Sequence, residues 1–250
     1  ANDSFLSPVA QSEQVTFFRD QILRDWFHGL GHRASDGFFV ALYINGQYWG
    51  LYNACERITD TFMEDTYDGG DWDVVKGSWD SINKYFTEAV DGDLAAWNEF
   101  GAWFESHDVS GDADFEALKK RLDYYNFLDY FILNIFCQNE DWPHNNWIAA
   151  RRKSDPPSLW TFHEWDAEWS LGLRPTGWQS DTLLWARGEN YYLQRQYTMP
   201  PLCLIFDGND IDPNATTPIN GILDHPHGER DFISRMEDIM NFNLNPSRSI

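Results

Sequence analysis

Basic residues are scarce in this chain. It has 18 lysines and arginines against 40 aspartates and glutamates, giving a formal net charge of -22 and a pI near 4.4. Such a field repels phosphate backbones and anionic lipid, so we expect no nucleic-acid partner. It also opposes a nucleoside triphosphate, so a nucleotide site here would need local cations and a divalent metal ion.

Cysteines and long apolar runs are also in short supply. Cys55, Cys137 and Cys203 are too few and too scattered for a disulfide framework or a zinc site, and an odd number leaves at least one thiol free. No run approaches about 18 apolar residues, so we expect no membrane insertion. The first residues contain neither an initiator methionine nor a signal region, which indicates an excised or processed segment of a larger protein.

What the chain does have is length and aromatic side chains. With 250 residues and 42% hydrophobic content it can bury a sizeable core, in one large or two-lobed domain. Aromatic residues make up 17%, including 13 tryptophans. Exposed indoles can stack on sugars, which would indicate a carbohydrate-binding protein. Many of these aromatics lie in periodic or alternating segments, however, and that placement favours a role in the core.

The first third of the sequence predicts a helix, a hairpin and a strand. Apolar residues recur at helical spacing over residues 15–30. Two β-rich runs, 37–44 and 47–54, are joined by Asn45-Gly46, a pair suited to the positive φ angles of a type I′ turn. A short helix over 59–67 and a strand over 72–77 follow, and the strand places Lys76 at its end.

The remainder predicts a mainly helical region interrupted by a second hairpin. Residues 80–135 are predicted to form three helical stretches, with breaks near 91–93 and 110–112, and the stretch 118–136 is the most apolar. Segments 146–152 and 159–163 flank a proline-containing turn and predict the hairpin. Beyond residue 172 the sequence predicts loops as far as residue 228, and 228–242 predict a closing helix. The expected fold class is α+β.

Polar residues gather where the apolar helix ends and the second hairpin begins. Asp141 and Asn146 lie in that connection, and Asp166 follows the hairpin. An Asp-x-x-x-x-Asn spacing, then a hairpin, then a metal-binding Asp is the order of the kinase active site. Glu164 and Glu168 bracket Asp166, and the strand-end geometry would allow one of them to reach the same metal ion, although a solvent-facing carboxylate is the favoured interpretation.

The spacing alone carries little information, because it occurs four times. It starts at Asp93, Asp129, Asp141 and Asp238. Of these, Asp141 is followed by both a hairpin and a second aspartate. Asp and Asn also routinely cap helices and turns. On spacing and context alone, the catalytic and the capping interpretations therefore both stay open.

A family resemblance adds to this pattern. The run Asn45-Gly-Gln-Tyr-Trp-Gly-Leu-Tyr52, followed by Glu56, resembles the signature of the CotH family, named for a spore-coat protein. Asp141 to Asn146-Trp147, and then Trp165-Asp166, match two later motifs of the same family in the same order. The likeness is most specific between residues 37 and 171.

The resemblance implies an atypical, two-lobed protein-kinase-like fold. Residues 1–79 would belong to a small β-containing N-lobe that would be truncated, and residues 80–250 to a larger, mainly helical C-lobe. The implied reaction moves the γ-phosphoryl group of ATP to Ser or Thr of a coat, matrix or other surface protein. The implied location is extracellular or at the cell surface, in a monomeric domain of a larger protein.

The resemblance also implies roles for five residues. Asp141 would be the catalytic base, and Asn146 and Asp166 would hold Mg²⁺ or Mn²⁺. Lys76 is the candidate for phosphate contact, with Glu56 as its ion-pair partner.

Several departures keep other functions open. The chain has no G-x-G-x-x-G loop, no His-Arg before Asp141 and no Phe-Gly after Asp166, which excludes a conventional protein kinase. Relatives have strands ahead of the first helix, so this chain would lack part of the roof over the nucleotide. A non-catalytic surface or adhesive module is therefore an alternative. A third is glycoside hydrolysis with Asp141 and Asp166 as paired carboxylates.

Overall fold

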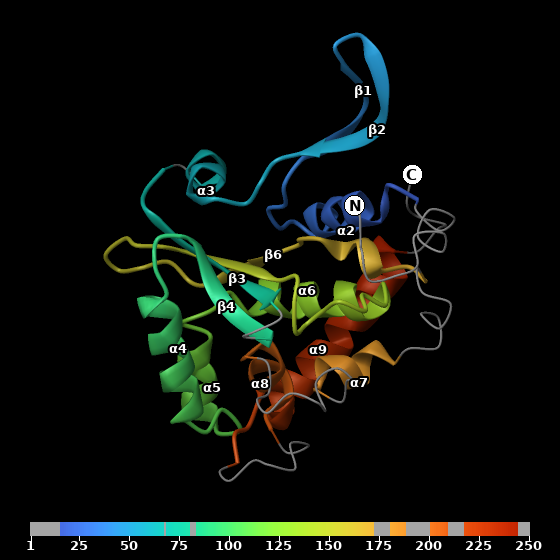
Figure 1. The fold of residues 1–250 in the computed structure, drawn as a ribbon. Helices are drawn as coiled ribbons and strands as arrows, with labels where there is room; N and C mark the ends of the chain where they lie inside the picture. The colour runs from blue at the N-terminus through green and yellow to red at the C-terminus, as the bar shows by residue number, and fades with distance from the viewer. Residues whose placement is uncertain are drawn as a thin grey trace.

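The structure is a computed structural model that describes residues 16–67, 69–80, 84–172, 181–188, 201–209 and 218–244. Within these ranges, helices accompany two small antiparallel sheets, as Figure 1 shows. The predicted α+β class is therefore confirmed. None of the helices in the described ranges is long and apolar enough to cross a bilayer.

The first predicted elements are confirmed closely. Helix α2 spans Arg19–Gly29, and the hairpin consists of β1, Gly37–Ile44, and β2, Gln47–Cys55. Asn45 and Gly46 have φ angles of 51° and 81°, which the tight turn requires.

The β1–β2 hairpin stands apart from the other strands. It forms a separate two-stranded sheet and projects from the rest of the described chain (Figure 1). Its 19 residues include no charged side chain, in a chain with a net charge of -22. Large apolar side chains on it are exposed, Phe38 by 67% and Trp49 by 58%. An exposed apolar surface of this kind is typical of a region that contacts another molecule.

The second sheet has the order β4-β3-β5-β6, with every pair antiparallel. These strands are β3, Trp72–Asp80; β4, Lys84–Asp91; β5, Ile148–Arg152; and β6, Thr161–His163. The β5–β6 hairpin confirms the second predicted hairpin. The helix predicted from residue 80 onward was wrong at its start, because β4 pairs with β3 along its length. Strand β3 is also longer than predicted, so Lys76 lies inside it.

The helical elements surround this sheet. The closing helix is confirmed as α9, Pro226–Asp238. Two short helices, α7 at Thr182–Ala186 and α8 at Pro201–Asp207, lie where loops were expected. The predicted lobe boundary at residues 79/80 falls in β3, whose pairing with β5 joins segments from both sides of it. The helices are α3, Asp60–Thr66; α4, Ala95–Glu105; α5, Asp112–Leu118; α6, Tyr124–Phe136; η1, Ala167–Trp169; α7, Thr182–Ala186; α8, Pro201–Asp207; η3, Ile222–Asp224; α9, Pro226–Asp238; and η4, Ile239–Asn243.

The core lies on both faces of the four-stranded sheet. On one face, α6 is buried over almost its whole length and packs with Trp97 and Trp160, whose rings are 5.1 Å apart. On the other face, Phe62 and Met63 of α3 pack against Ile148 of β5. Burial of this many aromatic side chains is a strong stabilising contribution. It fixes the ends of α6, β5 and β6, which carry the candidate site.

Candidate active site

The end of α6, the start of β5 and the end of β6 meet at one end of the four-stranded sheet, which we call its edge. In the sheet register, Lys76 of β3 lies opposite Ile148 of β5, which in turn lies opposite His163 of β6. The connection from α6 enters β5 at this edge, and the segment that follows β6 leaves from it. The topology therefore brings residues 138–147 and 164–166 together, although about 20 residues separate them in sequence.

Asn146 bridges the two acidic loops. Its side-chain Nδ2 donates to Asp141 Oδ2 at 3.0 Å and to the backbone carbonyl of Asp166 at 3.2 Å. Asn145 Nδ2 lies 3.3 Å from the same Asp141 oxygen, and His144 Nε2 lies 3.4 Å from Oδ1. The structure thus brings together Asp141, Asn146 and Asp166, the three residues that the sequence pattern selected.

The backbone conformation explains why Asn and Asp occupy these positions. Asn146 and Asp166 have φ angles of 52° and 51°, in the left-handed region. Asn and Asp adopt this region more readily than most residues with a side chain. Trp142 and Trp147 hold the two ends of the first loop, since both are buried and Trp142 Nε1 donates to Tyr130 Oη at 3.0 Å.

The Asp166 loop is anchored separately. The N–H of Ala167 donates to Asp20 Oδ1 at 3.1 Å, which ties the loop to the first turn of α2. The N–H of Glu140 donates to the carbonyl of Trp169 at 3.0 Å, which joins the two loops through their backbones. Asp141 is half-buried and Asp166 is exposed, so solvent can reach the oxygens between the loops.

Lys76 lies beside this edge but has a different partner from the one predicted. Its Nζ is 3.0 Å from Glu88 Oε1 on β4, and the ion pair with Glu56 is not formed. Ser78 Oγ also donates to Glu88, at 2.7 Å. Hydrogen bonds from Ser78 and Lys76 lower the pKa of this carboxyl. Strand β4, which the sequence predicted as helix, presents Glu88 directly opposite Lys76 in the β3–β4 pair, and this explains the partner.

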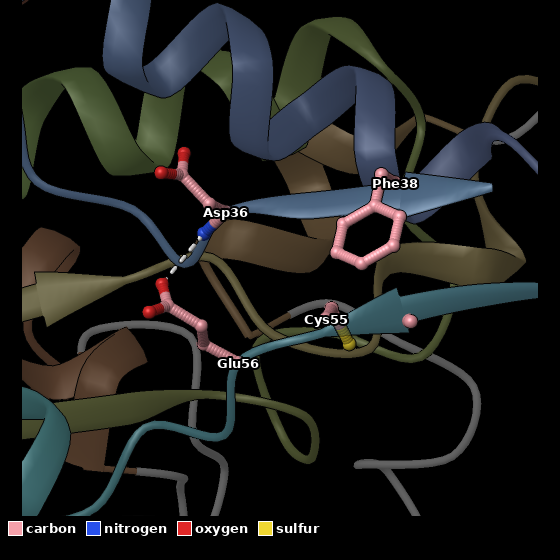
Figure 2. Close-up of a pocket in the computed structure, with 5 residues that line it drawn as sticks. Asp36, Phe38, Cys55 and Glu56 are labelled. Atoms are coloured by element: carbon pink, nitrogen blue, oxygen red, sulfur yellow. Dashed lines mark hydrogen bonds between the residues drawn. The ribbon is translucent and has the colours of Figure 1, made fainter. Parts of the chain in front are cut away.

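Glu56 instead closes the base of the first hairpin. Its Oε2 accepts the backbone N–H of Asp36 at 3.0 Å, as Figure 2 shows. Both residues line an open pocket at that base, together with Phe38, Ala54 and Cys55. The role predicted for Glu56 stays a prediction.

Glu164 is a residue whose environment the sequence reasoning missed. Its side chain was expected in solvent but is only 1% exposed. Burial raises its pKa to about 8, although hydrogen bonds from Asn134 oppose that shift. The preceding His163 is fully buried, and its pKa falls to about 4 for the same reason. The signal available in sequence was weak, because His163 is the last residue of a three-residue strand and Glu164 directly follows it.

The three central residues offer only oxygen donors. Asp141 and Asp166 contribute carboxylates and Asn146 an amide oxygen, which suits Mg²⁺ or Mn²⁺ rather than a soft metal ion. Among the described residues, no group of three or more His, Cys, Asp or Glu side chains could hold a metal ion. Mg²⁺ commonly uses one or two carboxylates and completes its shell with water and substrate phosphates, so this donor set fits it.

An acidic α+β domain with an Asp–Asn–Asp site between two loops is thus the class that the fold and site define. The sequence profile of the family described as CotH kinase protein matches residues 10–249, so the chain belongs to the CotH family. The chain is also similar to Invasin CotH2 of Rhizopus delemar, with 25% identity over 190 residues. That match covers 64% of this chain and 31% of the relative, so the chain spans about a third of that protein.

Proposed function

We propose that this domain transfers the γ-phosphoryl group of ATP to Ser or Thr of a surface, coat or matrix protein, through a two-lobed, kinase-like fold. The observation that supports this most is the Asn146 amide, which lies within hydrogen-bond distance of both Asp141 and the Asp166 backbone. The three residues that follow the kinase order of base, asparagine and aspartate are therefore neighbours, which supports the proposal.

Each residue has a distinct role in this proposal. Asp141 accepts the proton of the attacking hydroxyl, because it is the half-buried carboxylate held by neighbouring amides. Asn146 and Asp166 would hold Mg²⁺ or Mn²⁺, which supplies charge neutralisation of the phosphates when bound. Lys76, which pairs with Glu88 in this structure, would supply a cation at the same edge, where the net charge of -22 otherwise opposes phosphate binding. Phosphoryl transfer would then rest on positioning and electrostatic stabilisation.

Phosphoryl transfer is tested by incubating the purified chain with ATP and Mg²⁺ or Mn²⁺, and measuring phosphate incorporation into the chain itself and added Ser/Thr-rich proteins. Asp141→Ala and Asp166→Ala are expected to lose transfer. Asp238→Ala is the matched control, because Asp238 begins the same Asp-x-x-x-x-Asn spacing but is exposed on α9. Retained transfer in both site variants would remove the assignment.

A second function is favoured by one specific observation. The uncharged β1–β2 hairpin exposes several aromatic side chains, and one relative is named an invasin. Both are compatible with a non-catalytic surface or adhesive module. This function predicts that ATP with Mg²⁺ or Mn²⁺ leaves the midpoint of thermal unfolding unchanged. A ligand bound to the folded chain at a hundred times its Kd should stabilise by about 2.7 kcal/mol, which is easily measured.

A further inference from the structure

A chain of buried amide groups runs behind the candidate site. The N–H of Asp141 donates to Asn139 Oδ1 at 3.3 Å, and Asn139 Nδ2 donates to Asn134 Oδ1 at 2.8 Å. Asn134 Nδ2 then donates to Glu164 Oε1 and Oε2 at 3.0 and 3.2 Å. All the donors point the same way, from the Asp141 loop through α6 to the carboxylate at the end of β6.

These hydrogen-bonded amides form a ring together with the contacts that Asn146 makes on the solvent side of the site. Glu164 stands two residues before Asp166, and Asn146 joins the backbone of Asp166 to the carboxylate of Asp141. The Asp141 loop and the Asp166 loop are therefore connected twice. The front connection uses Asn146, which lies at the surface of the site, and the rear connection is fully enclosed.

The residues of the rear connection are buried, and burial makes each of its hydrogen bonds costly to lose. Asn134, Asn139 and Glu164 are each only 1% exposed. A buried polar group that loses its partner cannot turn to water instead, so it bears the full cost of desolvation. Asn134 Nδ2 also donates to the backbone carbonyl of Tyr130 at 2.9 Å, so removing the Glu164 acceptor leaves one of its two N–H groups unsatisfied. We expect that disturbance to pass through Asn139 to the Asp141 loop.

We propose that Glu164, Asn134 and Asn139 are positioning residues that hold the Asp141 loop in register with the Asp166 loop. The proposal rests on the proposed phosphoryl transfer for its catalytic consequence, but the mechanical coupling does not depend on it. None of the three needs to touch substrate, since each acts through the placement of the Asp141 backbone.

The test compares two substitutions of Glu164. Glu164→Gln keeps an acceptor oxygen for Asn134, whereas Glu164→Met has a similar size and removes it. Amide hydrogen exchange of residues 138–147 is measured relative to α4, together with kcat and the KM for ATP. In Glu164→Met we expect exchange in the loop to be about tenfold faster, which is the effect of one net hydrogen bond. We also expect kcat to fall about tenfold with KM nearly unchanged, and Glu164→Gln to stay close to the unsubstituted chain.

A matched control separates positioning from general loss of stability. Asn126 is also buried on α6, but it bonds the backbone of Phe162 on β6. Asn126→Ala is expected to lower global stability without selectively speeding exchange in residues 138–147. If Glu164→Met does not fold, Asn139→Ala breaks the chain at its other end and serves in its place.

The outcomes keep the two proposals apart. Equal loop exchange in Glu164→Met, Asn126→Ala and the unsubstituted chain would overturn the positioning role, even in an active enzyme. Selective loop exchange in a chain that transfers no phosphate would support the positioning role and contradict the proposed activity.

Discussion

The side-chain amide of Asn146 donates to the carboxylate of Asp141 at 3.0 Å. The same nitrogen lies 3.2 Å from the backbone carbonyl of Asp166, so one amide group holds two loops that β5 and β6 separate in sequence. This contact places a neutral donor next to the Asp141 carboxylate. The site is therefore sensitive to the charge of residue 146.

Replacing Asn146 with Asp should make stability depend on divalent metal ions. The substitution sets a second carboxylate next to Asp141, and two like charges at such a distance raise the pKa of one group and destabilise the fold. We expect a loss of about 1–2 kcal/mol in EDTA, or roughly 2–8 °C in Tm, and substantial recovery in Mn²⁺. Thermal unfolding in both buffers measures this difference.

The control for Asn146→Asp is Asn98→Asp. Asn98 is exposed on α4 and stands at the same spacing from Asp93. The substitution adds the same charge but should give no metal-dependent change in Tm. A similar response of both variants to Mn²⁺ would show that the effect comes from net charge and not from the site.

Buried His163 should make the protein less stable in acid. Its Nδ1 lies 3.2 Å from the carbonyl of Arg33, and its pKa in the folded chain is about 4, below the ordinary value of 6.5, mainly because of burial. Between these values the unfolded chain binds more protons at His163, so the contribution of His163 to the free energy of unfolding rises with pH from 4 to 6.5. The contribution is about 3 kcal/mol over that window. The raised pKa of Glu164 acts in the opposite direction above pH 4.5, so the His163 contribution is measured as a difference between variants.

His163→Gln should flatten that pH dependence, because glutamine does not titrate. Urea unfolding at pH 4.5, 5.5 and 6.5 gives the slope for each variant. His28→Gln is the control, since His28 is exposed on α2. If the unsubstituted chain and His163→Gln have parallel slopes, the burial of the imidazole does not control acid stability.

Local sequence signals predicted the elements whose turns have strong preferences. Asn45-Gly46 fixed the register of the first hairpin, and a proline-containing turn marked the second. Strand β4 was missed because its stability comes from pairing with β3, a partner that local periodicity cannot reveal. The partner of Lys76 was missed for the same reason, since Glu88 is carried by that strand.

The candidate site likewise has residues that the sequence selected and residues that it did not. Motif order was enough to select Asp141, Asn146 and Asp166, which the fold brings together. It gave no indication of the enclosed amides of Asn134 and Asn139, whose contacts depend on how α6 packs behind the loops. Asp129 begins the same spacing and ends it at Asn134, yet its carboxylate forms a buried ion pair with Arg235. Spacing therefore identifies a site only when topology is known.

Two glycines at the end of α2 should respond to alanine in opposite directions. Gly29 ends the helix, while Gly31 has a φ of 95°, and an added Cβ would meet nothing within 4 Å at either position. Gly29→Ala should stabilise by about 0.4–1 kcal/mol through the unfolded state, and Gly31→Ala should destabilise by at least as much. Urea unfolding of both variants provides the comparison, and a shift in the same direction would contradict the conformational argument.

The largest loss of stability is expected at the buried carboxylate of Asp129. Arg235 of α9 donates to both of its oxygens, at 2.6 and 2.7 Å, and His32 Nε2 lies 2.6 Å from one of them. Because Asp129 is fully buried, removing the guanidinium leaves a charge with too little compensation. Arg235→Met should therefore cost about 3 kcal/mol, whereas Arg230→Met, which breaks an exposed pair on the same helix, should stay within about 0.5 kcal/mol. Chemical denaturation measures both, and Asp129→Asn combined with Arg235→Met should recover part of the loss. Equal effects of the two arginine substitutions would mean that the buried pair does not hold α6 and α9 together.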